Sequence, residues 1–506
     1  MKPLDWAVLF GWLTFIVSYG LYRGRGSNSV QNYLLAGKTM PWYAMGLSIM
    51  ATQASAITFI STTAQAYVDG MRFVQFYFGL PIAMVILSAT VVPIFHRAKV
   101  YTAYEYLEQR FDTKTRALVS IVFLIQRGLA AGVALYAPAV VLSVILGWPD
   151  RVTTAVMGAL IVLYTATGGI KAVTWADVQQ MIMILAALVF SLILAIHMLP
   201  HGISFLDALH LAGAAGRLNP VDWHFDLNNR YNVWSGLIGG SFLALAYFGC
   251  DQSQVQRYLT GRSIAQSRLS LLFNAVAKVP MQAFILFIGA MVFVLFLFIQ
   301  PPAIFHPVEA ERASQAAGWS TIEQHYNAAF AARRAASYRL ADAIHNHSAH
   351  QQQALAEFRA SQTTFEDTRK EALAAVDKAE GSTGFNDTNY IFVSYITRFL
   401  PVGVVGLLIA VIFSAAMSSS SGEINSLATV SVIDIYRRHI HRNASDRHYL
   451  WASRLFTVFW GAYAVVFANS TRSFGALIEA VNQVGSLFYG GLLGVFVLAF
   501  GAKHVR

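Results

Sequence analysis

The sequence predicts an all-α polytopic membrane protein, and three observations lead to this fold class. Hydrophobic residues make up 56% of the 506 residues and charged residues only 12%, against roughly 25% charged residues in ordinary soluble domains. Apolar stretches of about twenty residues, the length of a membrane-spanning helix, recur along nearly the whole chain. The single cysteine, Cys250, excludes an internal disulfide framework.

We predict eleven membrane-spanning helices, most of them of about twenty residues or longer. The first, Leu4–Tyr22, lacks a basic amino-terminal region and a small-residue cleavage site. We therefore expect a retained span and not a signal peptide. The eleven predicted spans are 4–22, 42–67, 73–95, 118–146, 152–168, 173–199, 232–256, 270–299, 401–436, 449–468 and 474–500.

The basic residues of the loops predict the orientation of the chain. Placing the N-terminus outside puts most loop Lys and Arg residues, such as Arg97 and Arg437, on the cytoplasmic side, and leaves few, such as Arg72, outside. This asymmetry follows the positive-inside rule and predicts an N-out/C-in topology. It also explains the net charge of +10 without nucleic acid, because these loops lie next to anionic lipid.

The segment between the eighth and ninth spans departs from the membrane pattern. Residues 305–386 are rich in Ala, Gln, Arg, Glu and His, and Tyr326 and Phe330 recur at helical spacing. We expect one or two amphipathic helices that form an external hairpin.

Polar residues within the second and sixth spans indicate where a site lies, because such residues are costly in a membrane and usually face a cavity or one another. Five of them interrupt Gly46–Phe59. This pattern favours a cavity-lining or unwound segment, although an ordinary helix with hydroxyls bonded back to its own carbonyls remains an alternative. In the sixth span, Asp177 is open to two interpretations, a favourable interaction with the helix dipole or a cation site.

The seventh and eighth spans carry further polar residues. The seventh span is apolar up to Tyr247 and then contains Gly249, Asp251 and several glutamines. A glycine followed by polar residues predicts a helix that is broken partway across the membrane. Lys278 in the eighth span either extends to the membrane interface along its own stem or serves a site within the membrane.

Four consecutive serines and a glutamate lie in the ninth span, within Phe413–Tyr436. Residues at i, i+3 and i+4 share a helix face, so the hydroxyls of Ser418 and Ser419 flank the carbonyl of Ala415. Neutral oxygens suit an alkali cation, whereas divalent ions normally require several carboxylates. A close-packing face of small residues is an equal alternative, and no partner is predicted for Glu423.

Four stretches together resemble the sodium:solute symporter family, which includes sodium/glucose cotransporters, the sodium/proline symporter and sodium/sialic acid transporters. These stretches are NYLLAGKTMPWYAMGLSIMATQASAITF, TATGGIKAVTWADVQQ, DQSQVQRYL and AMSSSSGEINSLATVSVIDIY. The match runs from about Leu4 to Val505 apart from the external insert. The resemblance implies a leucine-transporter-type five-plus-five inverted repeat, with substrate and ion at midplane beside discontinuous helices.

The implied repeat divides the chain into five parts. These are the first span and its loop (1–41), the first inverted repeat with spans two to six (42–199), an external loop with spans seven and eight (200–299), the helical insert (300–386), and spans nine to eleven (387–506).

The resemblance also implies a sodium site that bridges the two repeats. Its ligands, carried over by position, are the backbone carbonyls of Ala51, Ala54 and Ala415 and the hydroxyls of Ser418 and Ser419. Some family members bind a second sodium through an aspartate and later hydroxyls, to which Asp177 and Ser421 correspond. Gly422, however, stands where those members have a further hydroxyl, which counts against a second ion.

The implied substrate pocket matches the sugar-transporting members only in part. Its predicted lining residues are Gln53, Thr58, Tyr77, Tyr247, Lys278 and Gln483. Ala244 stands where those members have an asparagine. In the third span, Tyr77 and Leu80 stand where those members have two polar residues. A pocket built for hydroxyl groups would be poorly matched by this set, so a hexose is disfavoured, and Lys278 is compatible with a small anion.

The resemblance implies a secondary active transporter and not an enzyme. It would couple sodium influx to uptake of a small polar organic solute (an organic anion, amino acid, vitamin or sugar-like molecule) by alternating access in the plasma (inner) membrane. The expected partners are the solute, sodium and the lipid bilayer, without nucleic acid, and the sequence leaves the oligomeric state open. The alternatives are a membrane sensor of the same fold and a proton-coupled carrier that uses Asp177 or Glu423.

Overall fold

The computed structural model describes an all-helical chain. The structure describes residues 1–56, 58–226, 228–229, 231–316, 318–380, 384–470, 477–502 and 504. At residues 137, 140, 380, 470, 477–484 and 486 it describes the backbone only. The described residues contain no β-strand, and only an isolated bridge joins Met40 and Gly261. The predicted all-α fold class is therefore confirmed.

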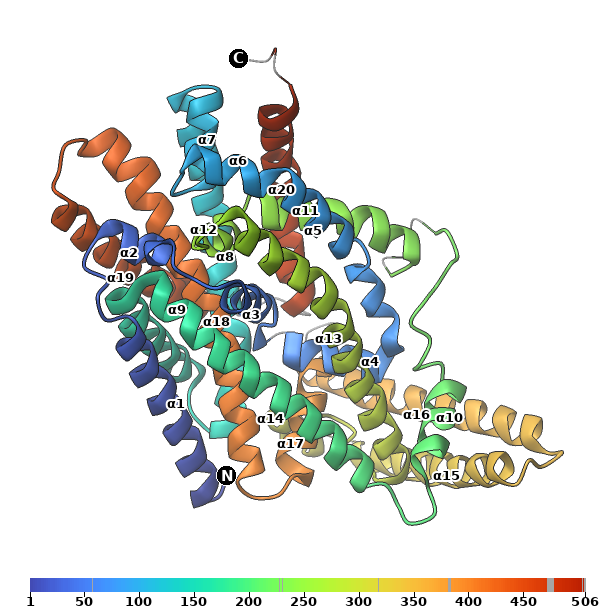
Figure 1. Cartoon of the computed structure of the whole chain (residues 1–506). Coiled ribbons are helices and arrows are strands. Elements are labelled where there is room, and N and C mark those ends of the chain that lie inside the picture. The colour runs from blue at the N-terminus through green and yellow to red at the C-terminus, as the bar shows by residue number, and fades with distance from the viewer. Residues whose placement is uncertain are drawn as a thin grey trace.

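Figure 1 shows the helices gathered into one bundle with a projecting pair. Up to residue 214 they are α1 (Pro3–Arg23), α2 (Val30–Leu35), η1 (Ala36–Lys38), α3 (Trp42–Gln53), η2 (Thr58–Thr62), α4 (Thr63–Asp69), η3 (Gly70–Tyr77), α5 (Leu80–Ala89), α6 (Val91–Ala98), α7 (Ala103–Arg110), α8 (Thr113–Leu146), α9 (Asp150–His197) and α10 (Phe205–Ala214). The others are η4 (Ser235–Gly239), α11 (Gly240–Gly249), α12 (Gln252–Leu259), α13 (Ile264–Phe298), α14 (Pro307–Ser314), α15 (Trp319–His345), α16 (Gln351–Glu380), η5 (Thr388–Tyr390), α17 (Ile391–Phe399), α18 (Val404–Val430), η6 (Ser431–Ile440), α19 (Asp446–Ser470) and α20 (Leu477–Gly501).

The eleven predicted spans can be traced in this set of helices. Seven described helical stretches are long and apolar enough to cross a membrane. Two of these seven, 58–98 and 150–197, each cover parts of two predicted spans, and shorter apolar helices at 235–249 and 487–501 supply the seventh and eleventh. The chain is an integral, multi-pass membrane protein.

Helix α9 contains the fifth and sixth predicted spans because it is kinked at Gly169. This residue has φ 59° and ψ −155°, and a Cβ there would lie 2.3 Å from a backbone carbonyl oxygen of α2. Glycine is required on both counts. The first arm of α9 runs alongside α1, since Trp148 stacks on Trp6 at one end and Gly168 packs against Gly24 at the other.

Two helices are interrupted inside the bundle, as the polar residues of the second and seventh spans predicted. α3 ends at Gln53, and the helix resumes at Thr58. α11 ends at Gly249, and α12 starts two residues after Cys250. The carboxylate of Asp251 caps α12 by accepting a hydrogen bond from the backbone N–H of Ser253 at 2.9 Å, which is a favourable place for a negative charge.

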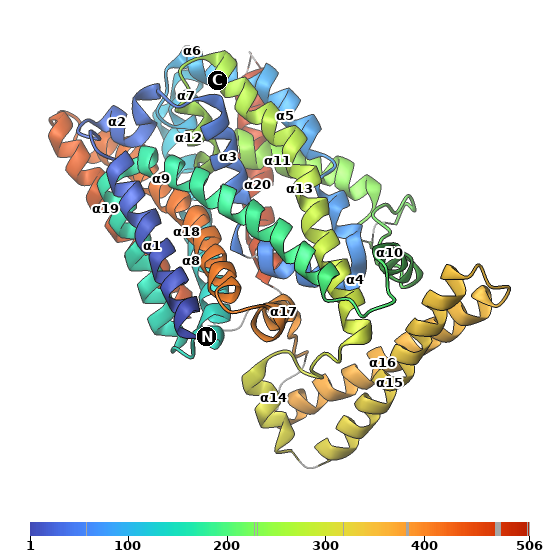
Figure 2. The same ribbon diagram turned by 60° about the horizontal axis from the view of Figure 1, so that its bottom comes forward.

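The predicted external hairpin is also present. Helices α15 and α16 pack against each other and project from the bundle (Figure 2). Arg333 anchors α15, because its guanidinium lies 3.4 Å from the ring centroid of Phe365 and donates to the carbonyl of Phe296. Figure 2 places the hairpin at the same end of the bundle as the N-terminus, while α20 runs to the opposite end (Figure 1).

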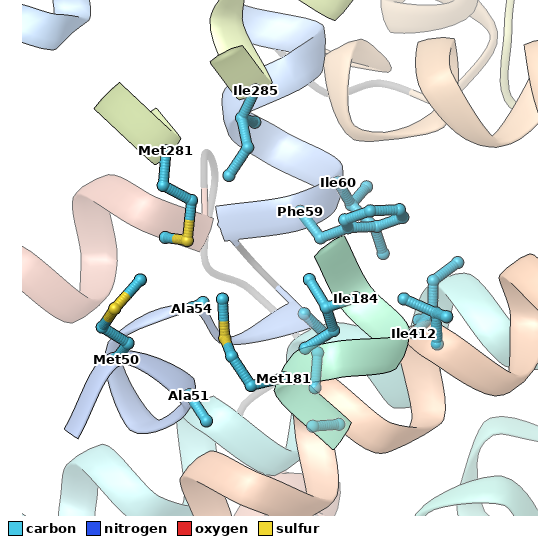
Figure 3. Close-up of a cluster of buried hydrophobic side chains, with 14 of the residues drawn as sticks. Met50, Ala51, Ala54, Phe59, Ile60, Met181, Ile184, Met281, Ile285 and Ile412 are labelled. Atoms are coloured by element: carbon cyan, nitrogen blue, oxygen red, sulfur yellow. The ribbon is translucent and has the colours of Figure 1, made fainter. Parts of the chain in front are cut away.

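An apolar cluster surrounds the break in the second span. Figure 3 shows Met50, Ala51 and Ala54 near Met181 of α9, with Ile412 of α18 farther along the same cluster, and all five are buried. The break is therefore enclosed by helices from distant parts of the sequence.

Candidate functional site

A cavity of about 180 Å³ lies inside the bundle, next to both helix breaks. Gln53 and Ser55 line it from the break after α3, and Tyr247 and Phe248 line it from the last turn of α11. The segments η3 and α5 contribute aromatic and aliphatic wall residues, and α8, α18 and α20 contribute polar ones. The two discontinuous helices therefore border one cavity.

The structure brings most of the predicted pocket residues to this cavity. Gln53, Thr58, Tyr77 and Tyr247 all line it. The hydroxyl of Tyr247 accepts a hydrogen bond from the side-chain amide of Gln254 at 2.7 Å, which fixes the ring at the cavity edge. The side chain of Gln483 lies outside the described residues.

Lys278 lies directly behind the cavity wall and does not reach the membrane interface. Its side chain is fully buried, its Nζ lies 5.3 Å from the ring centroid of Tyr77, and it has no hydrogen-bond partner among the described residues. The interpretation that Lys278 extends to the interface is therefore wrong. Neighbouring helices enclose its stem on every side, so the ammonium is held near the cavity.

The serine face of α18 borders the same cavity. Ser419 lines it, and its hydroxyl donates to the carbonyls of Ala415 and Ala416, at 3.2 Å each. Ser418 donates to Oδ1 of Asp177 at 2.6 Å. Both hydroxyl oxygens keep lone pairs in these arrangements.

The carbonyls predicted to complete the sodium site belong to the broken helix. Ala51 lies in the last turn of α3, where carbonyl groups lack partners further along the helix. Ala54 lies in the break itself, with φ −84° and ψ 57°. The five-oxygen sodium site remains a prediction, and this backbone geometry is compatible with it.

Asp177 is held in a buried network of ion pair and hydrogen bonds. Its Oδ2 accepts a hydrogen bond from Ser48 at 2.6 Å and lies 3.5 Å from Nη2 of Arg257, and Arg257 also donates through Nε to Ser48 at 3.1 Å. Both charged side chains are fully buried. Asp177 lies eight residues beyond Gly169, the start of the second arm of α9, whereas the helix dipole acts within the first turn. The dipole interpretation therefore does not account for it.

The guanidinium of Arg257 fills the space beside Gly422. A Cβ on Gly422 would lie 2.0 Å from Nη2 of Arg257, so a hydroxyl-bearing side chain there would require the guanidinium to move. The hydroxyl of Ser421 is used within the helix, where it donates to the carbonyl of Ser418 at 3.0 Å. At the predicted second sodium site, the protein therefore supplies its own cation to Asp177.

A second buried charge cluster lies in the cavity wall, and it provides the partner of Glu423. Arg127 of α8 donates through Nη1 to Glu423 at 2.9 Å and through Nη2 to the hydroxyl of Tyr489 at 2.9 Å. Nη2 also contacts Asp251 at the break after α11. Arg127, Glu423 and Tyr489 line the cavity, so one arginine ties together α8, α18, α20 and the second break.

Arg127 and Arg257 were missed by the sequence reasoning, although a signal existed. A charged residue within a membrane span marks a site or a partner by its cost alone, and Arg127 follows the apolar run VFLI in the fourth span. The predicted seventh span ends at 256 and thereby assigns Arg257 to the cytoplasmic loop that follows, whereas the structure buries it in α12. That assignment was wrong because α12, the half-helix after the break, is folded inside the bundle.

Comparison with known proteins gives the family. A profile described as the sodium:solute symporter family matches residues 33–325 and 370–505. The chain belongs to this family. Residues 326–369, which fall outside the match, form most of the projecting hairpin α15–α16.

Curated relatives align along nearly the whole chain. It is 27% identical to sodium-coupled monocarboxylate transporter 1 of Mus musculus, over 98% of this chain and 68% of the relative. It is 26% identical to the sodium/iodide cotransporter of Homo sapiens (95% and 62%) and 25% identical to the sodium-dependent multivitamin transporter of Oryctolagus cuniculus (98% and 66%). The chain thus spans about two thirds of the length of these transporters.

A solved structure supports the fold. The substrate-bound outward-open state of a Na⁺-coupled sialic acid symporter superposes with a TM-score of 0.74 at 24% identity, over 99% of this chain and 87% of that chain. The leucine-transporter-type fold is thereby confirmed. As a member of this family, the protein is a sodium-coupled solute transporter of the plasma membrane with sodium as its coupling ion.

Proposed function

We propose that this transporter takes up a small organic monoanion, such as a short-chain monocarboxylate, together with sodium. The observation that carries the proposal is Arg127 in the cavity wall. Its Nε is buried without a hydrogen-bond partner among the described residues, so the guanidinium retains a donor for a substrate carboxylate. Arginine is well suited to this task because its planar fork matches the geometry of a carboxylate.

The balance of buried charge also favours a monoanion. With Lys278 protonated, Arg127 and Lys278 contribute two positive charges near the cavity, and Asp251 and Glu423 contribute two negative charges. Sodium adds one positive charge to this balanced set. A monoanionic substrate restores neutrality, which matters because an uncompensated charge inside a membrane protein is costly.

The remaining wall suits a short apolar tail. Phe73, Phe76, Leu80 and Leu243 face the cavity, and apolar walls with a few polar groups are typical of small-molecule sites. The names of the relatives agree with this chemistry, since sodium-coupled monocarboxylate transporters 1 and 2 occur among them. A carboxylate beside Arg127 with its tail toward the aromatic side satisfies both parts of the cavity.

Sodium would act by joining the broken helix to α18. In this proposal the carbonyls of Ala51 and Ala54 and the oxygens of Ala415, Ser418 and Ser419 hold the ion. Its binding from outside orders the break after α3 and completes the cavity wall at Gln53 and Thr58. Rocking of one half of the bundle against the other then exposes sodium and substrate to the inside.

The proposed charge balance sets the driving force. One sodium with one monoanion carries no net charge, so the membrane potential does not contribute, and a tenfold sodium gradient supplies about 1.4 kcal/mol. This gradient supports roughly tenfold accumulation. A neutral solute would also gain roughly 2.3 kcal/mol at 100 mV, which makes measurement of current a direct test of substrate charge.

Uptake into proteoliposomes tests the proposed function. We expect an inward sodium gradient to drive uptake of a labelled short-chain monocarboxylate, and a sodium ionophore to abolish it. Its amide analogue, which lacks the charge, is expected not to compete. Uptake that persists when choline replaces sodium would favour the proton-coupled alternative, and binding without uptake would favour a sensor.

The sodium site is tested by Ser419→Ala. We expect the sodium concentration for half-maximal uptake to rise at least about tenfold, because one of five oxygen ligands is lost; a loss of about 1.4 kcal/mol gives this factor. Ser420→Ala is the matched control, since Ser420 is equally buried on the same helix and is not a predicted ligand. Equal sodium dependence in the two variants would contradict the site.

A further inference from the structure

A second cavity lies at the end of the bundle where the basic loops gather, and the transport site does not use it. Its volume is about 740 Å³, and it lies between the end of α1, the residues just before α3, the second arm of α9 and the start of α13. Among the described residues that line it, four are cations and none is acidic. The four are Arg23, Arg25, Lys171 and Arg262.

The cations are held in place but are not neutralised. The guanidinium of Arg23 lies 3.9 Å from the ring centroid of Trp175, and that of Arg25 lies 5.5 Å from the ring of Tyr22. Stacking on a ring leaves the N–H edges of a guanidinium available, and Nε of Arg23 is buried with no hydrogen-bond partner in the described part of the chain. Within the described part of the chain, no carboxylate lies within ion-pair distance of any of the four.

Positive charges gathered around one cavity repel one another, and a bound anion relieves this repulsion. Phosphate suits the set of donors, because arginine forks bind its oxygens in pairs and lysine adds a point charge. The positive-inside pattern places all four cations on the cytoplasmic side, where the membrane surface is itself rich in anionic headgroups.

The surroundings of the cavity indicate a lipid as the source of the phosphate. Tyr22 and Tyr43, both lining residues, are 62% and 46% exposed, and exposed tyrosines are typical of membrane interfaces. From the cavity, α13 continues with Leu269, Leu272 and Val276, which are exposed and spaced along one helix face. This apolar stripe offers a path for an acyl chain that starts at the cavity.

We propose that the basic cavity binds the phosphate headgroup of an anionic phospholipid of the cytoplasmic leaflet, with its acyl chains along the stripe on α13. The lipid then bridges α1 and α9 to α3 and α13. Since α3 is one arm of the broken helix beside the transport cavity, lipid composition becomes linked to the element that sodium orders.

The test uses the purified full chain and measures binding of phosphatidylglycerol and phosphatidylcholine by native mass spectrometry. The test variant is Arg25→Gln/Lys171→Gln, because neither side chain forms a hydrogen bond with another residue that the structure describes. The control is Lys114→Gln/Arg447→Gln, which removes the same charge from exposed cytoplasmic positions outside the cavity. We expect the Kd for phosphatidylglycerol to rise roughly 30-fold in the test variant and less than about threefold in the control.

The other outcomes would overturn the proposed lipid site. Equal losses in both variants, or equal binding of the two lipids, would overturn the proposal in favour of diffuse attraction to the basic face. Inorganic phosphate that displaces the lipid at equal concentration would assign the cavity to a free anion. Should the double variant not fold, Arg25→Gln alone carries the comparison, with an expected rise of roughly fivefold.

Discussion

Arg127→Gln is expected to abolish sodium-driven uptake and to lower the stability of the protein by about 3–5 kcal/mol. The substitution leaves Asp251 and Glu423 buried without their shared cation. It also removes the donor that the proposed substrate carboxylate requires. Thermal inactivation in detergent measures the loss of stability, and uptake by the folded fraction measures the loss of transport.

Two further variants separate the structural role of Arg127 from its role in binding. Arg127→Gln/Glu423→Gln removes one of the two carboxylates that Arg127 compensates, so it should recover part of the stability, because Asp251 still lacks a cation, but not the uptake. Arg127→Lys keeps the charge and loses the planar fork, so it should fold and raise KM for the substrate. Uptake at the normal rate in a folded Arg127→Gln variant would contradict the proposed carboxylate site.

Asp177→Asn is expected to have the second large effect, again about 3–5 kcal/mol of stability. The change leaves the guanidinium of Arg257 buried without a counter-charge. It also weakens the acceptor that holds Ser418, a predicted sodium ligand, so the sodium dependence of uptake should shift as well. Thermal inactivation and sodium titration of uptake measure the two effects.

The partner of Asp177 provides the control. In Asp177→Asn/Arg257→Gln both charges are absent, and we expect stability to return most of the way to the wild-type value. If Arg257 fills the second cation position, uptake by the wild type depends on sodium with a Hill coefficient near one. A coefficient near two, or a double variant less stable than Asp177→Asn, would contradict the pairing.

Much of the candidate site could be predicted from local patterns. A polar run within an apolar span signals a break or a cavity wherever it falls, because the cost of a polar group in a membrane depends on burial and not on a particular partner. This reasoning indicated a cavity-lining or unwound segment within Gly46–Phe59, which includes Gln53, and a break after Gly249, whereas Tyr247 was assigned to the pocket from the family resemblance. It did not predict which polar groups meet.

The charge pairs depend on contacts between distant parts of the chain. Arg127 meets Glu423 across 296 positions and Asp251 across 124, and Asp177 meets Arg257 across 80. No periodicity in the sequence encodes such a meeting, because it depends on how whole helices pack. The position of Lys278 could not be predicted for the same reason. Its burial behind Tyr77 depends on the neighbouring helices and not on its depth in the span.

The sequence by itself predicted the membrane class, the positions of the apolar helices, the polar interruptions of the second and seventh spans and the helical hairpin. These features follow from hydrophobicity and backbone preferences over a few turns of chain, which are local properties. Only the tertiary structure decided that Arg257 occupies the space beside Gly422 and that Arg127 closes the cavity wall. A buried charge has to find its counter-charge in three dimensions, and helices far apart in the sequence supply it.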